Sequence, residues 1–172
     1  MKLSNKKSSY IVLDQGTSGT KAFLFSKNGH VLFSKKVKHS LYKPAPHNVE
    51  CDPSIILNAC ISLLHSMVEF ADDNQLSIIS AGLTVQRSTF MFWEKDSGKI
   101  RTPAISWQDS RAKKEADEKQ DLADFIWGKT GTPLSAHFGG PKYVHFTRQD
   151  SSLKSDTENG KVLFGPISAF IS

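Results

Sequence analysis

Residues 10–39, YIVLDQGTSGTKAFLFSKNGHVLFSKKVKH, decide the expected fold because they hold three apolar runs separated by two turns. The first run ends in Asp14 and leads into a turn of glycine and hydroxyl residues at 15–20. The second turn, at 27–30, contains the Asn-Gly pair that is typical of β-hairpins. We therefore expect three consecutive antiparallel strands, at 10–14, 21–26 and 31–39.

Downstream of these strands, helical and extended patterns alternate. Asp52 and Pro53 form a helix-start signal, and apolar residues then recur at helical spacing through Phe70. The continuous apolar run 78–85 predicts a central, parallel strand. Further on we expect a hairpin at 90–100, helices at 110–120, 122–127 and 142–149, a polar loop at 151–160, a strand at 162–164 and a helix from Pro166. This order of elements is that of the α/β ribonuclease-H-like fold, whose mixed sheet begins with three antiparallel strands and has flanking helices.

Composition limits the class of protein. The 172 residues include 22 basic and 17 acidic side chains, which give a net charge of +5, and 38% of the residues are hydrophobic. These proportions suit one globular domain over residues 10–172, preceded by a flexible N-terminus at residues 1–9. No apolar run approaches the roughly 18 residues of a membrane span, and no signal core follows the N-terminus. We therefore expect a cytoplasmic protein without a membrane partner.

Nucleic-acid binding, disulfides and zinc are not expected either. The basic residues are spread along the chain instead of forming a stripe with interleaved aromatic residues. Cys51 and Cys60 cannot make a disulfide framework and have no histidines at zinc spacing. Cys60 lies on the apolar stripe of the expected helix, where a thiol usually serves as a small hydrophobic side chain.

The first candidate site is the turn that follows the first strand. A strand-terminal carboxylate and a turn of glycine and hydroxyl residues direct N–H and O–H groups to one point, which suits a phosphate beside a hydrated divalent cation. The candidate phosphate-binding residues are Asp14, Gln15, Gly16, Thr17 and Ser18, and Asp14 is also the candidate metal ligand. The stretch is not a P-loop, because the Gly-Lys-Ser/Thr pattern is missing and no helix follows. An ordinary hairpin turn is the alternative interpretation.

Two further candidate groups lie at later strand ends. Gln86, Arg87 and Ser88 directly follow an expected strand, and ligands of open α/β sheets bind beyond such ends. Arg87 can donate several hydrogen bonds to ligand hydroxyls or a carboxylate, although a surface arginine is the alternative. Trp107 and Asp109, both candidate substrate residues, lie at a strand-to-helix junction. Trp107 can cover the C–H groups of a sugar or polyol, whereas Asp109 can instead be a helix N-cap.

Six stretches follow one family in order and in spacing, namely 11–18, 49–53, 82–87, 93–99, 105–111 and 163–165. By these stretches the chain resembles the N-terminal domain of the FGGY carbohydrate kinases, and within that family the glycerol kinases. The resemblance implies an actin-like fold in which two ribonuclease-H-like domains close over a cleft. It also implies transfer of the γ-phosphoryl group of ATP, with Mg²⁺, to a hydroxyl of a sugar or polyol. Asp14 is then the metal- and phosphate-associated carboxylate, the turn Gly16, Thr17 and Ser18 binds phosphate, and Arg87 and Trp107 contact the substrate.

Two positions depart from the glycerol kinase pattern. Glycerol kinases follow Gln-Arg with a glutamate that contacts the polyol, and here Ser88 takes its place. They also have a tyrosine before a Phe-Ser-Gly-Thr-Lys stretch, whereas here His137 precedes residues 138–142. Both changes fall on the substrate pocket, so His137 joins the candidate substrate residues and the expected substrate is an unspecified sugar or polyol.

The resemblance assigns no catalytic residue to this chain. The family's base is an aspartate beyond the helix that begins here at Pro166, and a second domain that holds the nucleotide follows it. We therefore expect the truncated N-terminal part of a carbohydrate kinase, inactive as 172 residues because phosphoryl transfer needs both reactants positioned.

The alternative is a non-catalytic module that acts in binding or association, as a homo-oligomer or with a complementing chain. Ile167, Phe170 and Ile171 are the expected exposed apolar positions that favour association. A nuclease is disfavoured, because no second strand-borne carboxylate accompanies Asp14.

Overall fold

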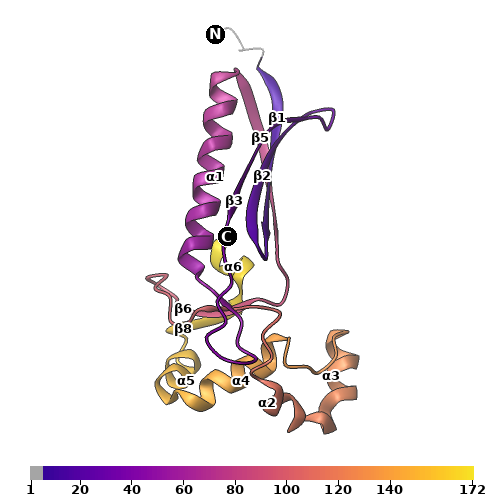
Figure 1. Cartoon of the computed structure of the whole chain (residues 1–172), viewed down its shortest axis with the longest axis vertical. Helices are drawn as coiled ribbons and strands as arrows, with labels where there is room; N and C mark the ends of the chain where they lie inside the picture. Colours follow the sequence, from indigo (N-terminus) through magenta and orange to yellow (C-terminus); the bar gives the residue numbers. More distant parts are fainter. Residues whose placement is uncertain (1–5) are drawn as a thin grey trace. The chain divides into compact units, whose positions relative to one another are not determined.

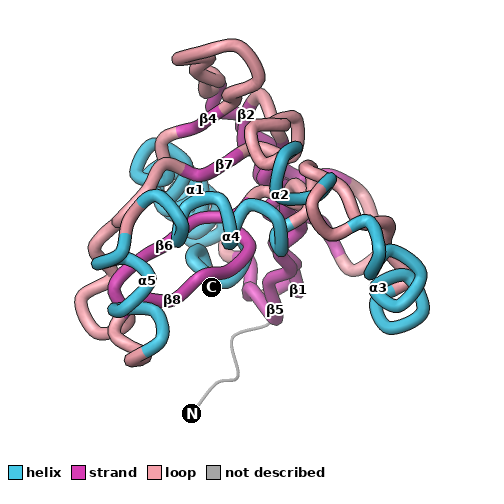
Figure 2. Tube along the Cα trace, turned by 90° about the horizontal axis from the view of Figure 1, so that it is seen from below, coloured by secondary structure: helices cyan, strands magenta, loops and turns pink. Residues whose placement is uncertain are grey.

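The computed structural model describes residues 6–172, which fall into two compact units, each with a four-stranded sheet. Unit 1 comprises residues 6–40 and 54–86, and unit 2 comprises residues 41–53 and 87–172. The sequence predicted one domain over 10–172, but the strands separate into two sheets. The strand order in unit 1 is β3-β2-β1-β5. In unit 2 it is β4-β7-β6-β8, and Figure 2 labels these four strands.

The first three strands of unit 1 form the predicted antiparallel meander, made by β1 (Lys7–Gly16), β2 (Gly19–Ser26) and β3 (Val31–Lys38). The turn between β1 and β2 is shorter than predicted and consists of Thr17 and Ser18. Residues 7–9, expected in the flexible N-terminus, pair as strand residues. Residues 1–5 of that expected segment lie outside the described residues.

Helix α1 (Pro53–Asp73) covers one face of the unit 1 sheet (Figure 1). Its buried residues recur at helical spacing, as predicted, and are Ile56, Ala59, Cys60, Leu63, Met67 and Ala71. The ring of Phe70 stacks on Phe33 of β3 at 4.6 Å between centroids. Among the described residues, α1 is long and apolar enough to cross a membrane by length and composition alone, although polar residues interrupt its apolar sequence. Its packing on the sheet accounts for one face of this helix, whereas Ile55, Ile61 and Val68 are 42%, 43% and 43% exposed.

Strand β5 (Leu76–Val85) runs parallel to β1, as predicted, but it is an edge strand and not a central one. Six of its residues, 79–84, are exposed in the described part of the chain. Its continuous apolar sequence suggested burial on both sides, because such runs are typical of central parallel strands.

Unit 2 is built on β6 (Phe90–Glu94) and β8 (Val162–Pro166), which pair antiparallel. The strands β4 (Glu50–Cys51) and β7 (Ala104–Ile105) complete the sheet with two residues each. Such short strands carry no alternation, so the sequence did not predict them. The core centres on Phe92, which is buried with Leu153 and Val162.

The helices of unit 2 are α2 (Lys113–Asp117), the 3-10 helix η1 (Gln120–Leu122), α3 (Ala123–Thr130), α4 (Gly139–Gln149), α5 (Ser151–Glu158) and α6 (Ile167–Ile171). The helix predicted at 110–120 is therefore shorter, and the polar loop predicted at 151–160 is mostly helix. Asp150 explains α5, since its carboxylate accepts a hydrogen bond from the Leu153 N–H at 2.9 Å. That hydrogen bond lowers the pKa of Asp150, and burial of Leu153 anchors the helix.

The apolar residues of α6 are less exposed than the sequence suggested. Ile167 is fully buried, while Phe170 and Ile171 are partly buried. Phe170 packs edge-on against Trp93 of β6, with 5.7 Å between the ring centroids. The expectation that these three positions form an exposed patch is therefore wrong for Ile167 and weakened for the other two.

Helix α4 starts at Gly139, earlier than the predicted Lys142. Its first two glycines, Gly139 and Gly140, should respond differently to substitution by alanine. A Cβ on Gly139 would lie 2.7 Å from Cε1 of Phe90, whereas nothing lies within 4 Å of a Cβ on Gly140. We expect Gly139→Ala to lower the free energy of unfolding by about 1–3 kcal/mol through overpacking. Gly140→Ala should instead raise it by about 0.4–1 kcal/mol, because alanine loses less backbone entropy. Urea denaturation of both variants checks this, and equal effects would contradict it.

Candidate functional site

The predicted phosphate turn lies at the end of the β1–β2 hairpin in unit 1. A Cβ on Gly19 would approach the carbonyl oxygen of Val37 to 2.8 Å, so a glycine is needed where β3 passes close to the turn. Ser18 is exposed and Thr17 partly buried. Asp14 precedes the turn with its side chain 39% exposed, and its Oδ2 lies 3.7 Å from Nζ of Lys21. The hairpin thus presents a carboxylate accessible to solvent beside two hydroxyl residues.

Two buried amide side chains adjoin this turn in unit 1. The Gln86 N–H donates to the carbonyl oxygen of Gln15 at 2.8 Å, which places the end of β5 next to the end of β1. Gln15 is fully buried and donates from Nε2 to the Gly16 carbonyl at 2.9 Å. Within residues 6–172, Oε1 of Gln15 and both polar atoms of the Gln86 side chain have no hydrogen-bond partner. Leaving such a group buried and unsatisfied costs about 1–3 kcal/mol, so these amides are candidate hydrogen-bonding partners for a ligand or a water molecule.

A metal ion at the turn would have one protein carboxylate, that of Asp14. In the described part of the chain no three His, Cys, Asp or Glu side chains come together as a metal site. Mg²⁺ is commonly held by one or two carboxylates together with substrate phosphates and waters. A single accessible carboxylate at a phosphate turn therefore fits Mg²⁺ shared with a nucleotide, and does not fit a zinc site made by protein side chains alone.

Unit 2 brings together three of the predicted substrate residues: Ser88, Trp107 and His137. Nδ1 of His137 lies 2.9 Å from the carbonyl oxygen of Trp107. The Trp107 side chain is 43% exposed, and the His137 side chain is exposed as well. Arg87 directly precedes Ser88 and is exposed, with no hydrogen bond or ion pair to another described residue. The arrangement leaves an aromatic face, an imidazole and a guanidinium accessible to a ligand.

A residue that the sequence did not single out, Lys142 of α4, joins these segments. Its side chain is completely buried. Nζ donates to the carbonyl oxygens of Ser106 at 2.7 Å, His137 at 3.0 Å and Ser88 at 3.4 Å. Burial lowers the pKa of Lys142 to about 8, while the charge of Asp109 acts in the opposite direction. No local pattern reveals a buried lysine, because its partners are backbone groups distant in sequence.

With this geometry in view, comparison with known proteins gives the family. Residues 9–165 match the FGGY family of carbohydrate kinases, N-terminal domain. The chain belongs to this family. It is 31% identical over 162 residues to the glycerol kinase of Beijerinckia indica, covering 93% of this chain and 32% of that protein. It is 31% identical over 163 residues to glycerol kinase 1 of Thermotoga maritima, covering 94% of this chain and 33% of that protein.

Solved structures give the same family. The crystal structure of Plasmodium falciparum glycerol kinase with ADP matches with a TM-score of 0.89 at 25% identity, over 96% of this chain and 34% of that one. Gluconate kinase from Lactobacillus acidophilus matches with a TM-score of 0.84 at 21% identity, over 96% of this chain and 32% of that one, which shows a shared fold. The chain thus spans about a third of the length of these relatives. The predicted resemblance to FGGY kinases is confirmed.

The carboxylate of Asp109, a predicted site residue of this FGGY domain, accepts its hydrogen bonds from protein groups. It is completely buried, and Oδ2 accepts hydrogen bonds from the Val49 N–H at 2.6 Å and from Nη2 of Arg111 at 2.8 Å. Oδ1 accepts from the N–H and Nε of Arg111 at 3.0 Å each. It is not the N-cap of α2, whose N-cap is Ala112. Asp109 therefore holds the segment after Trp107 in place.

Arg111 links this carboxylate to a second one. Its Nη2 also lies 2.6 Å from Oε1 of Glu50 on β4. Burial acts to lower the pKa of Arg111, but hydrogen bonds with Asp109 and Glu50 outweigh it and raise that pKa. The pair thus connects β4 with the stretch 107–111 inside unit 2.

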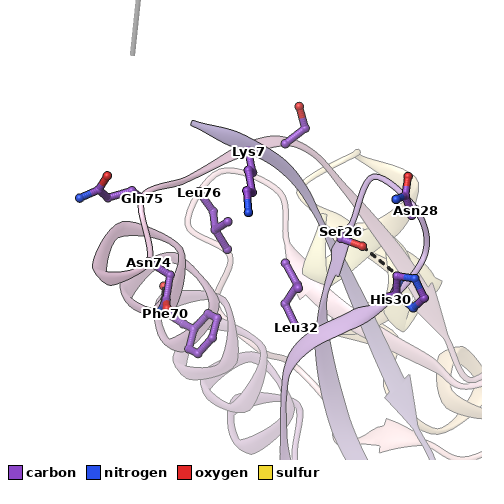
Figure 3. A pocket seen from close by; sticks show the side chains of 10 residues that line it. Lys7, Ser26, Asn28, His30, Leu32, Phe70, Asn74, Gln75 and Leu76 are labelled. Atoms are coloured by element: carbon purple, nitrogen blue, oxygen red, sulfur yellow. Dashed lines mark hydrogen bonds between the residues drawn. The ribbon is translucent and has the colours of Figure 1, made fainter. Parts of the chain in front are cut away.

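Unit 1 also has a pocket of about 590 Å³ at the end of the sheet where β1 begins, away from the phosphate turn. Figure 3 shows Lys7 pointing toward the apolar side chains of Leu32, Phe70 and Leu76. None of the residues predicted from the FGGY motifs lines it. No sequence motif predicts this pocket, since its lining comes from strand starts, the turn between β2 and β3 and the end of α1.

Proposed function

We propose that this FGGY domain is the phosphate- and substrate-binding part of an ATP-dependent kinase that phosphorylates a hydroxyl of a sugar or polyol. The proposal rests chiefly on the strand ends of unit 1. There the accessible carboxylate of Asp14 and a glycine-bounded turn adjoin the unsatisfied buried amides of Gln15 and Gln86. The family and the glycerol kinase relatives support the same assignment.

The nucleotide phosphates bind at the turn Gly16, Thr17 and Ser18, with Mg²⁺ held by Asp14. Bound Mg²⁺ neutralises charge on the phosphate oxygens during phosphoryl transfer. Asp14 suits this role because its carboxylate is accessible and its neighbour Lys21 lies 3.7 Å away, too far for a tight competing ion pair. The relative from Plasmodium falciparum was solved with ADP, which supports a nucleotide ligand.

The substrate binds on unit 2 against Trp107, with Arg87 and His137 as hydrogen-bonding residues. The exposed indole covers C–H groups, while the guanidinium and imidazole bond hydroxyls. Ser88 supplies a short hydroxyl where glycerol kinases have a charged acceptor. The favoured substrate is therefore a sugar or polyol other than glycerol.

If Ser88 disfavours glycerol as a substrate, the variant Ser88→Glu should gain activity with glycerol. The variant is placed in a chimera that joins this chain to the remaining two-thirds of the Thermotoga maritima relative. A charge-assisted hydrogen bond contributes about 1.5–3 kcal/mol, so kcat/KM for glycerol should rise by roughly ten- to a hundredfold. Ser88→Gln is the matched control, since it has the same length without the charge. If the unmodified chimera uses glycerol as well as Ser88→Glu does, Ser88 does not set specificity.

The same chimera tests the proposed function. Purified chimera is assayed for ADP formation with ATP, Mg²⁺ and a panel of polyols and sugars, beside the 172-residue chain alone. We expect substrate-dependent ADP formation by the chimera and none by the chain alone, because transfer needs donor and acceptor positioned together. A folded chimera that is inactive with every substrate would refute the proposal. Activity of the chain alone would show that the 172 residues suffice.

A non-catalytic module that acts by association is the second candidate, and β5 favours it. This strand has ten residues without a charged side chain, and it lies at the sheet edge with Ile79 56% and Leu83 42% exposed. An exposed, uncharged edge strand is a template for pairing with another chain. Concentration-dependent sedimentation together with an inactive chimera would favour this function. For either function we propose a cytoplasmic location.

A further inference from the structure

Lys142 is unusual because a lysine side chain is rarely completely buried without a carboxylate partner. Within the described residues its nitrogen has no ion pair, and its acceptors are the backbone carbonyls of Ser88, Ser106 and His137. An ammonium group has three donors. All three are therefore used by the protein, and none remains for a ligand.

The three carbonyl groups belong to segments that are distant in sequence and that each include a proposed substrate residue. Ser88 follows Arg87, Ser106 precedes Trp107, and His137 is itself a proposed contact. A direct contact between Nδ1 of His137 and the Trp107 carbonyl at 2.9 Å joins two of the segments as well. One buried ammonium group therefore sets the distances among all three.

Of the three segments, the one at Ser88 has the least favourable backbone conformation. Its φ of 59° lies in the left-handed region, which is unfavourable for a residue with a Cβ. The next residue, Thr89, accepts a hydrogen bond from the Ile167 N–H at 2.9 Å, so the backbone is fixed on that side by α6. The Lys142 ammonium group contacts the Ser88 carbonyl itself at 3.4 Å.

We propose that Lys142 is a positioning residue for the substrate pocket, which holds Ser88, Trp107 and His137 in one arrangement by hydrogen bonds to backbone carbonyls. This inference rests on the proposed function, because it concerns the same pocket. Lys142 does not contact the substrate. Its loss changes how well the pocket is formed, and so it changes substrate binding more than nucleotide binding.

The arrangement depends on pH. Burial lowers the pKa of Lys142 to about 8, the charge of Asp109 raises it and the charge of Arg111 lowers it further. His137, whose carbonyl accepts one of the bonds, is the other titratable group in contact. Deprotonation leaves two N–H donors for three carbonyls. The pocket should therefore loosen as the pH rises through about 8.

The chain alone gives the first test, by NMR of the labelled protein from below to above this pH. We expect the Ser88 and His137 amide signals and the Trp107 indole signal to shift together with a midpoint near pH 8. In Lys142→Met this titration should disappear, whereas it should persist in Lys154→Met, which removes an exposed lysine. The wild-type titration needs no variant to fold. Absence of a common midpoint near pH 8 would overturn the proposal.

The chimera gives the second test. Lys142→Met should raise KM for the preferred polyol by about tenfold and leave KM for ATP nearly unchanged, since about 1.4 kcal/mol of positioning is lost. An equal rise in both KM values would indicate general loss of structure and would overturn the positioning role. An inactive wild-type chimera would refute the proposed function and the substrate role with it, while the NMR titration decides the role of the carbonyl contacts by itself.

Discussion

Asp109→Asn is expected to lower the free energy of unfolding by about 3–5 kcal/mol, the usual cost of removing one partner of a buried ion pair. The carboxylate of Asp109 is completely buried and accepts from Val49 and from Arg111 through both oxygens. Asparagine has the same shape but replaces one acceptor oxygen by an NH₂ donor, which would face an N–H group. Arg111 would then keep Glu50 as its carboxylate partner. Domains are stable by only about 5–15 kcal/mol, so the loss is large.

Urea denaturation of the 172-residue chain measures this effect, with Asp117→Asn as the control. Asp117 is 57% exposed and pairs with Lys113 one helical turn away at 2.6 Å. An exposed pair of this kind contributes about 0.2–1 kcal/mol, so the control should be close to wild type. Equal stability of the two variants would show that the contacts of Asp109 do not support the fold.

The sequence predicted the elements whose signals are local. The Asn-Gly turn predicted the hairpin between β2 and β3, and Gly29 has the positive φ of 80° that such a turn requires. The Asp-Pro signal predicted the start of α1 at Pro53. These features depend on neighbouring residues alone, so the local sequence pattern predicts them.

Features that depend on distant partners were missed. The strands β4 and β7 are held by pairing with each other and with β6, and two residues show no alternation. The edge position of β5 depends on which strands pair with it. Helix α5 was missed for another reason, because the polar sequence hid the N-cap Asp150 and the single buried residue Leu153.

The candidate site also combines residues with local sequence signals and contacts between residues that are distant in sequence. Asp14 and the glycine turn were predicted because strand, carboxylate and turn follow one another in sequence. The supporting contacts were not predicted: Asp109, a candidate substrate residue by its sequence, binds Val49 and Arg111 instead, and Lys142 binds three carbonyls. Candidate ligand-binding residues can be predicted from motifs, whereas the residues that hold them in place become visible once the chain is folded.

Asp14→Asn in the chimera is expected to lower kcat by about 10²–10³-fold, a loss typical of removing an electrostatic group that acts on the transition state. Asparagine keeps the size and one oxygen but removes the charge that holds the cation. Stability should hardly change, because the Asp14–Lys21 pair is exposed and an exposed pair contributes about 0.2–1 kcal/mol. A low kcat in a chain of unchanged stability is therefore the signature of a functional carboxylate.

The matched control is Asp72→Asn, which removes an exposed carboxylate in the same unit, 4.0 Å from Lys6. Its kcat and its thermal midpoint should both equal those of the unmodified chimera. Raising the Mg²⁺ concentration should restore part of the rate of Asp14→Asn, because more Mg²⁺ increases the occupancy of a site whose affinity for the cation is lower. A kcat for Asp14→Asn equal to that of the control would place the cation elsewhere. The turn after β1 would then be an ordinary hairpin, the alternative that its sequence allowed.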